Sequence, residues 1–278
     1  MPCFLPVGPG RSREFDGVKG FFTFSVLKKR DVMWIPLNDA PLGEPLLLAR
    51  VTDVDLDLRL QRMGLFQGSE IVRLDQEVLI QSIRVAGPRG EVVLGGGMAM
   101  KTVVHLDDGR RLPLAEVKPG ECGHIEGLTG GSALSRALDV LGLKSDDCIR
   151  VSRRLPPMEY AVLVEPGNRV MLTDGMAAKV WGKIQERFQQ LVTAAVGRSF
   201  LVVEILGGYY ARKQLGSHGI EPRRTIVLET VAGAQVLRHE VRNPVVVVSR
   251  GGLRLFLRPR EGERIFVWRA GTEKTQKK

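Results

Sequence analysis

The sequence predicts a mainly β protein that consists of three small closed β-barrels in tandem, each with one short helix. Two sets of glycines recur in step along the chain, which indicates an internal repeat of about 77 residues. Each glycine of the first set precedes a predicted strand, and the set is Gly43, Gly120 and Gly197. Each glycine of the second set ends a predicted helix, and the set is Gly64, Gly142 and Gly219. Because solenoid repeats are about 20–50 residues long, this period favours separate tandem domains.

The composition is that of a folded protein in a reducing compartment. Of the 278 residues, 44% are hydrophobic, which argues against disorder. The three cysteines, Cys3, Cys122 and Cys148, are too few for a disulfide framework, and their odd number indicates free thiols. No apolar run approaches the roughly 18 residues of a membrane-spanning helix, and residues 1–32 lack the apolar core of a signal peptide. We therefore expect a cytoplasmic protein.

The first predicted module covers residues 33–106 and follows a leader. The leader, residues 1–32, is either a disordered tail or a stretch that precedes the true start of translation at Met33. In the module, residues 46–51 are typical of a buried strand. The apolar residues of the following helix lie four and three positions apart, on one helical face, and are Leu56, Leu60 and Met63.

The second module covers residues 107–182 and shows the pattern most clearly. After Gly120 it reads as a strand, a short helix that ends at Gly142, and then further strands. Near Met176 the apolar spacing changes to three and four residues, which predicts a helix. The apolar residues of this helix are Ala177, Val180, Trp181, Ile184, Phe188 and Leu191. We therefore expect a helical linker over residues 183–193, between the second and third modules.

The third module covers residues 194–268, and a polar tail, residues 269–278, follows it. This part of the chain is strongly basic: residues 194–278 contain 16 basic and seven acidic side chains, hence +9 of the net charge of +10. The basic character therefore belongs to the third module and its tail.

The three modules resemble the FeoA domain family, and the second resembles it best. The matching residues of the second module are Lys118-Pro119-Gly120, Gly123, Ile125, Leu134, Leu138, Leu141-Gly142-Leu143, Ile149, Val151 and Arg169-Val170-Met171-Leu172. Those of the first module are Leu37 to Gly43 and Met63-Gly64-Leu65-Phe66-Gln67-Gly68. The third module is similar more loosely. The sequence departs from the family in having three copies, of which the third is basic.

The resemblance implies both a fold and a function. FeoA domains have an SH3-like β-barrel fold, so it implies three tandem SH3-like barrels. As small separate proteins they are cytoplasmic accessories of the bacterial ferrous-iron transporter FeoB, and related domains end metal-dependent repressors. By resemblance, this chain is a non-enzymatic adaptor of ferrous-iron transport or iron homeostasis that acts through protein–protein contacts. Its expected partner is a membrane transporter of the FeoB type, which would bring the chain to the inner face of the membrane.

The sequence contains no set of residues that predicts an enzyme. It has no phosphate-binding G-x-x-x-x-G-K-[ST] loop, no H-E-x-x-H and no C-x-x-C, and no serine is matched with a base and an acid. Cys122 and His124, with Cys148 on a neighbouring strand, are the candidate metal ligands, and thiolate with imidazole would suit zinc or iron. Because three ligands fall short of a complete structural site, we expect no bound metal and no other cofactor.

The basic residues of the third module are the candidate partner-binding residues. They lie on its predicted helix and strands and are Arg212, Lys213, Arg250, Arg254 and Arg258. Arg254 alternates with apolar neighbours and is expected to point outward from its strand. An acidic surface of a transporter is one partner for such a face. The alternative is nucleic acid, in which case the chain is a nucleic-acid-associated or metal-responsive regulatory protein.

Overall fold

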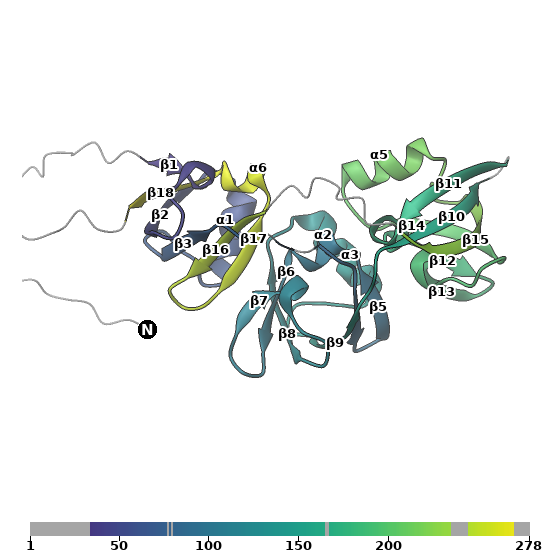
Figure 1. Ribbon diagram of the computed structural model, residues 1–278, viewed down its shortest axis with the longest axis horizontal. Coiled ribbons are helices and arrows are strands. Elements are labelled where there is room, and N and C mark those ends of the chain that lie inside the picture. Colours follow the sequence, from purple (N-terminus) through teal and green to yellow (C-terminus); the bar gives the residue numbers. More distant parts are fainter. Residues whose placement is uncertain (1–33, 77, 79, 165–166, 235–243, 270–278) are drawn as a thin grey trace, which may run out of the picture. The chain divides into compact units, whose positions relative to one another are not determined.

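The computed structural model shows strands and short helices arranged in three antiparallel sheets (Figure 1). The residues that it describes are 34–76, 78, 80–164, 167–234 and 244–269. Predictions for the leader and for most of the tail lie outside these residues. The prediction of a mainly β chain with three small β units is confirmed, because each sheet has six strands and at least one short helix. The predicted closure into barrels is wrong, because among the described residues the first and last strands of each sheet do not pair with each other. Within the described ranges, no helix is long and apolar enough to cross a membrane.

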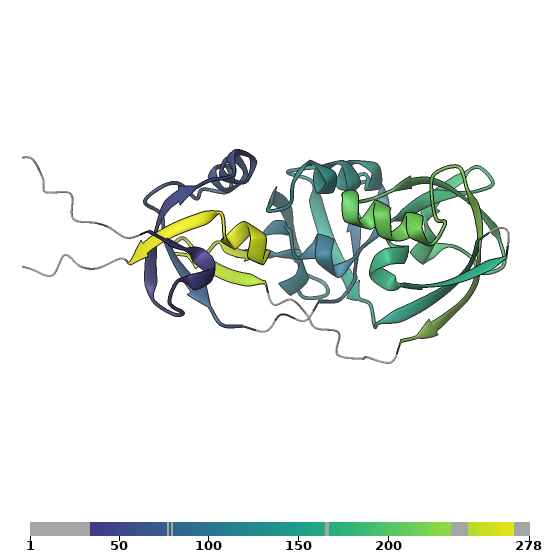
Figure 2. The same ribbon diagram turned by 90° about the horizontal axis from the view of Figure 1, so that it is seen from above.

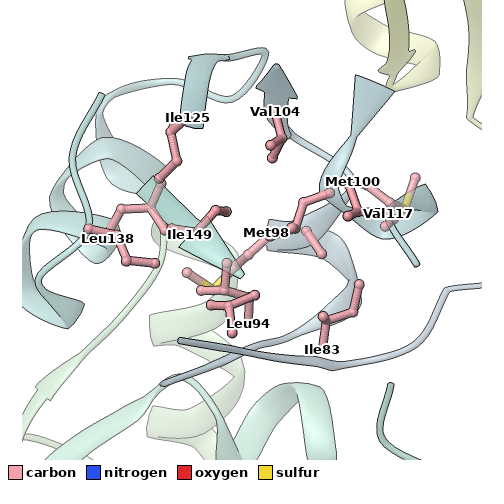
Figure 3. Packing of buried hydrophobic residues seen from close by; sticks show 14 of the residues in the cluster. Ile83, Leu94, Met98, Met100, Val104, Val117, Ile125, Leu138 and Ile149 are labelled. Carbon is pink, nitrogen blue, oxygen red and sulfur yellow. The ribbon is translucent and has the colours of Figure 1, made fainter. Parts of the chain in front are cut away.

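The middle sheet, sheet B, has the strand order β5-β4-β9-β8-β6-β7. Its strands are β4 (Ile83–Gly87), β5 (Gly90–Leu94), β6 (Thr102–Leu106), β7 (Arg111–Pro113), β8 (Cys122–Leu128) and β9 (Cys148–Arg154). Its helices are α2 (Gly96–Ala99), η2 (Leu114–Glu116) and α3 (Ser132–Leu141). Inward-facing side chains of all these strands meet α3 in one core, where Ile83, Ile125 and Leu138 are almost fully buried (Figure 3).

Sheet C repeats this order with the next set of elements, as β11-β10-β15-β14-β12-β13. Its strands are β10 (Met158–Val164), β11 (Asn168–Thr173), β12 (Val180–Ile184), β13 (Arg187–Gln190), β14 (Ser199–Ile205) and β15 (Thr225–Gly233). Its helices are α4 (Asp174–Ala177), η3 (Leu191–Thr193) and α5 (Tyr209–Ser217). Its separate core is centred on Phe200, which is fully buried.

Sheet A joins the two ends of the described chain, as β1-β18-β2-β3-β16-β17. Its strands are β1 (Ile35–Pro36), β2 (Pro45–Val51), β3 (Glu70–Leu74), β16 (Val245–Ser249), β17 (Arg254–Leu257) and β18 (Ile265–Arg269). Its helices are η1 (Leu37–Asp39), α1 (Val54–Arg62) and α6 (Pro259–Gly262). Figures 1 and 2 both show the yellow C-terminal strands beside the purple N-terminal ones. Residues more than 200 positions apart therefore share one core.

The sheets are offset from the sequence repeat by half a repeat. The first half of each repeat supplies a strand, a helix and a second strand, and the second half supplies a hairpin, a short helix and a further strand. Sheet B combines the first half of the second repeat with the second half of the first. Sheet C combines the third and second repeats in the same way, and sheet A combines the first and third. Each module predicted over 33–106, 107–182 and 194–268 is thus divided between two sheets, rather than forming a barrel of its own.

The connection between β9 and β10 shows why the halves separate. These strands follow each other in sequence but pair with β4 and β15, not with one another. Leu155-Pro156-Pro157 joins them, and proline both restricts the residue before it to extended backbone and lacks the N–H of a tight hairpin. The chain therefore runs on in an extended path into the next sheet.

The predicted linker helix over residues 183–193 is wrong. The structure has the hairpin β12–β13 there, and a short 3-10 helix follows. The apolar residues that suggested a helical face do not share one environment, since Leu191 is fully buried while Phe188 is 53% exposed. A Cβ at Gly182 would lie 2.2 Å from the backbone oxygen of Leu201, so only glycine permits this close approach of strands β12 and β14.

The glycine markers have the conformation that their repetition predicts. Gly64, Gly142 and Gly219 follow the helices α1, α3 and α5 with φ of 85°, 79° and 76°. This left-handed backbone closes a helix and is accessible to glycine at little cost. The prediction that each repeat contains a short helix ending in glycine is therefore confirmed.

Candidate functional sites

The helix α5 presents an aromatic and basic surface on sheet C. Of its residues only Leu215 is buried, whereas the side chains of Tyr209 and Tyr210 are 69% and 68% exposed. Arg212 and Lys213 lie on the same helix and are also exposed, and the Lys213 ammonium lies 5.9 Å from the centre of the Tyr209 ring. Within the described part of the chain, neither cation forms an ion pair. This surface therefore combines exposed aromatic area with positive charge.

A groove lies beside α5 and includes one of these cations. Its walls come from α5, from the end of β14 and from the turn that follows α5, and Arg136 of α3 closes one side. The apolar part of the lining is Ile205, Ile220 and Pro222. Arg136 is held there by an ion pair with Glu204 at 3.0 Å. The lining also includes Glu204 and Glu221, so the groove combines an apolar floor with two arginines and two carboxylates. Its charge is balanced, and the excess of positive charge lies on the exposed surface of α5 itself.

The remaining basic candidates lie on sheet A, although Arg260 of α6 donates to the Tyr210 hydroxyl of α5 at 3.3 Å. Arg250 follows β16 and has a side chain that is 82% exposed. Arg254 on β17 does not point freely outward, because its side chain is only 17% exposed and its Nε donates to Glu116 Oε2 at 2.5 Å. Arg258 precedes α6 and donates to Glu261 Oε1 at 3.2 Å. The five basic residues therefore divide between two sheets, and the three on sheet A are each paired with a carboxylate, Arg250 with Glu70 at 3.6 Å.

Of the candidate metal ligands, only His124 belongs to a close cluster of ligand atoms within the described residues. Cys122 lies two residues before His124 on β8, where its Sγ faces the Gly120 carbonyl oxygen at 3.7 Å. Cys148 on β9 is opposite His124 in the strand register but is exposed. His124 instead lies beside His105 of β6, its direct partner across the β6–β8 ladder. The two imidazole rings are 4.9 Å apart between centres.

The sequence reasoning missed His105 and Glu126 as neighbours of His124. The Oε2 atom of Glu126 lies 3.5 Å from His105 Nδ1 and 3.6 Å from His124 Nε2. His124 and Glu126 are two positions apart on β8, so a period of two already places them on one face. His105 comes from another strand, 19 residues earlier, and only the register of the ladder brings it close.

The comparison with protein families matches one part of this chain. Residues 112–184 match the FeoA domain. The comparison with curated proteins gives no match, and neither does the comparison with solved structures. The matched stretch runs from β7 to β12, so in the structure it spans half of sheet B and half of sheet C. The FeoA match therefore falls on the second of the three sequence repeats.

Proposed function

We propose that this chain is a non-enzymatic accessory protein of ferrous-iron transport, which acts through protein–protein contacts. The observation that carries the proposal is the FeoA domain at residues 112–184, because this family is associated with FeoB-type ferrous-iron transport. The partner is then a membrane transporter of the FeoB type, and the chain acts from the cytoplasm at the inner face of the membrane.

The surface of α5 is the best candidate for the partner contact. The three helices α1, α3 and α5 occupy equivalent places in the sheets but differ in surface. Helix α1 carries the acidic residues Asp55 and Asp57. On α3, Arg136 forms an ion pair with Glu204. Only α5 combines two exposed tyrosines with Arg212 and Lys213. Tyrosine and arginine are enriched among the residues that dominate binding energy at protein interfaces.

The test uses purified proteins and single charge reversals. The cytoplasmic domain of the FeoB-type transporter from the same genome is immobilised, and association of the full chain is followed by surface plasmon resonance. Arg212→Glu is expected to slow association about tenfold and to flatten its dependence on salt, since exposed charges act mainly through the on-rate and are screened within about 8 Å. Arg250→Glu changes the charge equally on sheet A and is expected to have little effect.

Two results would contradict the proposal. The first is no binding of the wild-type chain to the transporter domain together with unchanged ferrous-iron uptake in cells that lack the gene. The second is retention of the chain in cell extract through nucleic acid, seen as loss of its partners after nuclease treatment. If Arg212→Glu and Arg250→Glu slow association equally, the accessory function would still be supported, but α5 would not be the specific interface.

A further inference from the structure

We propose that His105, His124 and Glu126 form a binding site for one divalent transition-metal ion of the zinc and ferrous class on the outer face of sheet B. This inference is independent of the accessory function above, because it concerns binding by the isolated chain. It also replaces the expectation of no bound metal, which rested on Cys122, His124 and Cys148.

The three side chains point to the same side of the sheet. Their strand neighbours Val104, Leu106 and Ile125 are buried, and side chains alternate along a strand, so the three residues between them face outward. The side chains of His105 and His124 are 37% and 39% exposed, and that of Glu126 is 19% exposed. An ion could therefore reach the site from solvent and keep an open position for a further ligand.

The spacing of the ligand atoms fits one small ion. Each side chain offers one ligand atom, and the three atoms lie within 4.8 Å of one another. Two ligand atoms that bind one tetrahedral zinc ion at about 2.1 Å are about 3.4 Å apart. The two distances from Glu126 Oε2 to the imidazoles, 3.5 and 3.6 Å, are already near this value. Small side-chain rotations of the two histidines would complete the set.

Two local features hold the ligands in this arrangement. The β6–β8 ladder shifts register so that Val103 pairs with Gly127 and Val104 with Ile125, which leaves Glu126 as the extra residue of a β-bulge. Bulges re-aim a side chain and are frequent beside functional sites. At Gly123 a Cβ would lie 2.3 Å from the backbone oxygen of His105, so glycine at this position permits β8 to approach β6 beside His124.

Arg111 holds the carboxylate from its other side. Its Nη1 lies 3.5 Å from Glu126 Oε1, and its strand position pairs with His105 across β7 and β6. Oε1 is thus engaged by the guanidinium while Oε2 faces the imidazoles. Carboxylate ligands of metal ions are commonly oriented by such an outer hydrogen-bond partner.

The other two sheets show that the fold of the sheet does not need these residues. The same bulge occurs at the same place in β12–β14 and in β18–β2. The positions equivalent to His105, His124 and Glu126 are Lys183, Leu201 and Val203 in sheet C, and Trp268, Leu47 and Ala49 in sheet A. Since neither sheet has a metal-binding set there, two histidines and a glutamate serve something other than folding.

The chemistry of the ligand set defines the class of ion. Two imidazoles and one carboxylate bind zinc in open sites that retain a water molecule, and the same set binds non-haem ferrous iron. Oxygen-preferring ions such as Mg²⁺ and Ca²⁺ are disfavoured by the two nitrogen ligands.

The test is direct metal binding by the full chain, purified without a histidine tag. Equilibrium dialysis against Zn²⁺ with elemental analysis is expected to give one ion per chain, and Co²⁺ is expected to give the visible absorption of a nitrogen-ligated site. His124→Leu introduces the amino acid that sheet C has at the equivalent position, Leu201. This substitution is expected to abolish both metal signals while the circular dichroism spectrum is retained. Arg111→Gln is expected to weaken binding about tenfold or more.

Two control variants separate this site from other ligands. His218→Gln removes an imidazole just after α5 and is expected to leave binding intact, as is the double substitution Cys122→Ser and Cys148→Ser. Stoichiometric binding that survives His124→Leu, or that disappears in the cysteine variant, would overturn the assignment. Absence of uptake by the wild-type chain would do the same, without bearing on the transporter contact.

Discussion

Removal of the C-terminal strands is expected to unfold sheet A and to leave sheet C folded. A chain that ends at residue 234 lacks β16, β17 and β18, which are three of the six strands of sheet A. If each sequence repeat instead formed its own barrel, the same truncation would damage the module that contains β14 and β15. The two topologies therefore predict loss of structure in different parts of the chain.

The magnitude follows from the core of sheet A. Seven of its 17 buried hydrophobic residues belong to the removed segment, and these are Val245, Val247, Leu253, Leu255, Leu257, Ile265 and Val267. Full burial of one such side chain contributes about 1.5–3 kcal/mol, so together they contribute roughly 10–20 kcal/mol as an upper estimate. This is similar to or larger than the whole net stability of a typical domain, about 5–15 kcal/mol. The remaining half of sheet A is therefore not expected to stay folded.

Hydrogen exchange measured by mass spectrometry gives the readout. Residues 35–74 are expected to lose protection in the truncated chain, whereas residues 158–233 keep theirs. Sheet B is expected to lose some stability but keep its strands, because Val246 and Phe256 also pack on its core. Addition of a peptide of residues 244–269 is expected to restore protection of 35–74. Loss of protection in 158–233 with 35–74 unchanged would refute the exchanged topology.

Two further predictions concern buried polar groups. Gln190 is 2% exposed, and its amide accepts from Val93 N and donates to Val93 O and Ala178 O at 2.7–2.8 Å. Gln190→Ala leaves these backbone groups without partners and is expected to lower the free energy of unfolding by about 3 kcal/mol in urea titrations, whereas Gln189→Ala, beside it on β13, is expected to cost much less. Burial lowers the pKa of Lys101 from 10.5 to about 8. Between pH 8 and 10.5 the unfolded chain then binds more protons than the folded chain, so the free energy of unfolding is expected to rise with pH across that window. Lys101→Met is expected to remove this rise and to increase the free energy of unfolding at pH 7.

The outcomes that contradict these two predictions are also specific. Equal effects of the two glutamine substitutions would show that the Gln190 amide is not bound to the backbone of β5. A difference in stability between wild type and Lys101→Met that is the same at pH 7 and pH 10 would show that Lys101 is not desolvated in the folded state.

The sequence alone determined the local structure of each repeat. Helix ends at Gly64, Gly142 and Gly219 could be predicted, because a left-handed residue after a helix leaves a strong glycine signal. Strands could be predicted from apolar alternation. The FeoA resemblance, which the family match bears out for residues 112–184, came from the order of these same local signals.

Only the tertiary structure decided which halves pair, and therefore which residues meet. A strand's period shows which side is buried but not which neighbour it selects, so the exchange between repeats left no local signal. The prediction of a helix over 183–193 was wrong for a related reason. The apolar residues of the β12–β13 hairpin have helical spacing by chance, and only the tertiary structure shows that one of them, Phe188, is exposed. His105 joins His124 and Glu126 through strand register and a bulge, which are set by pairing between distant segments and not by either segment alone.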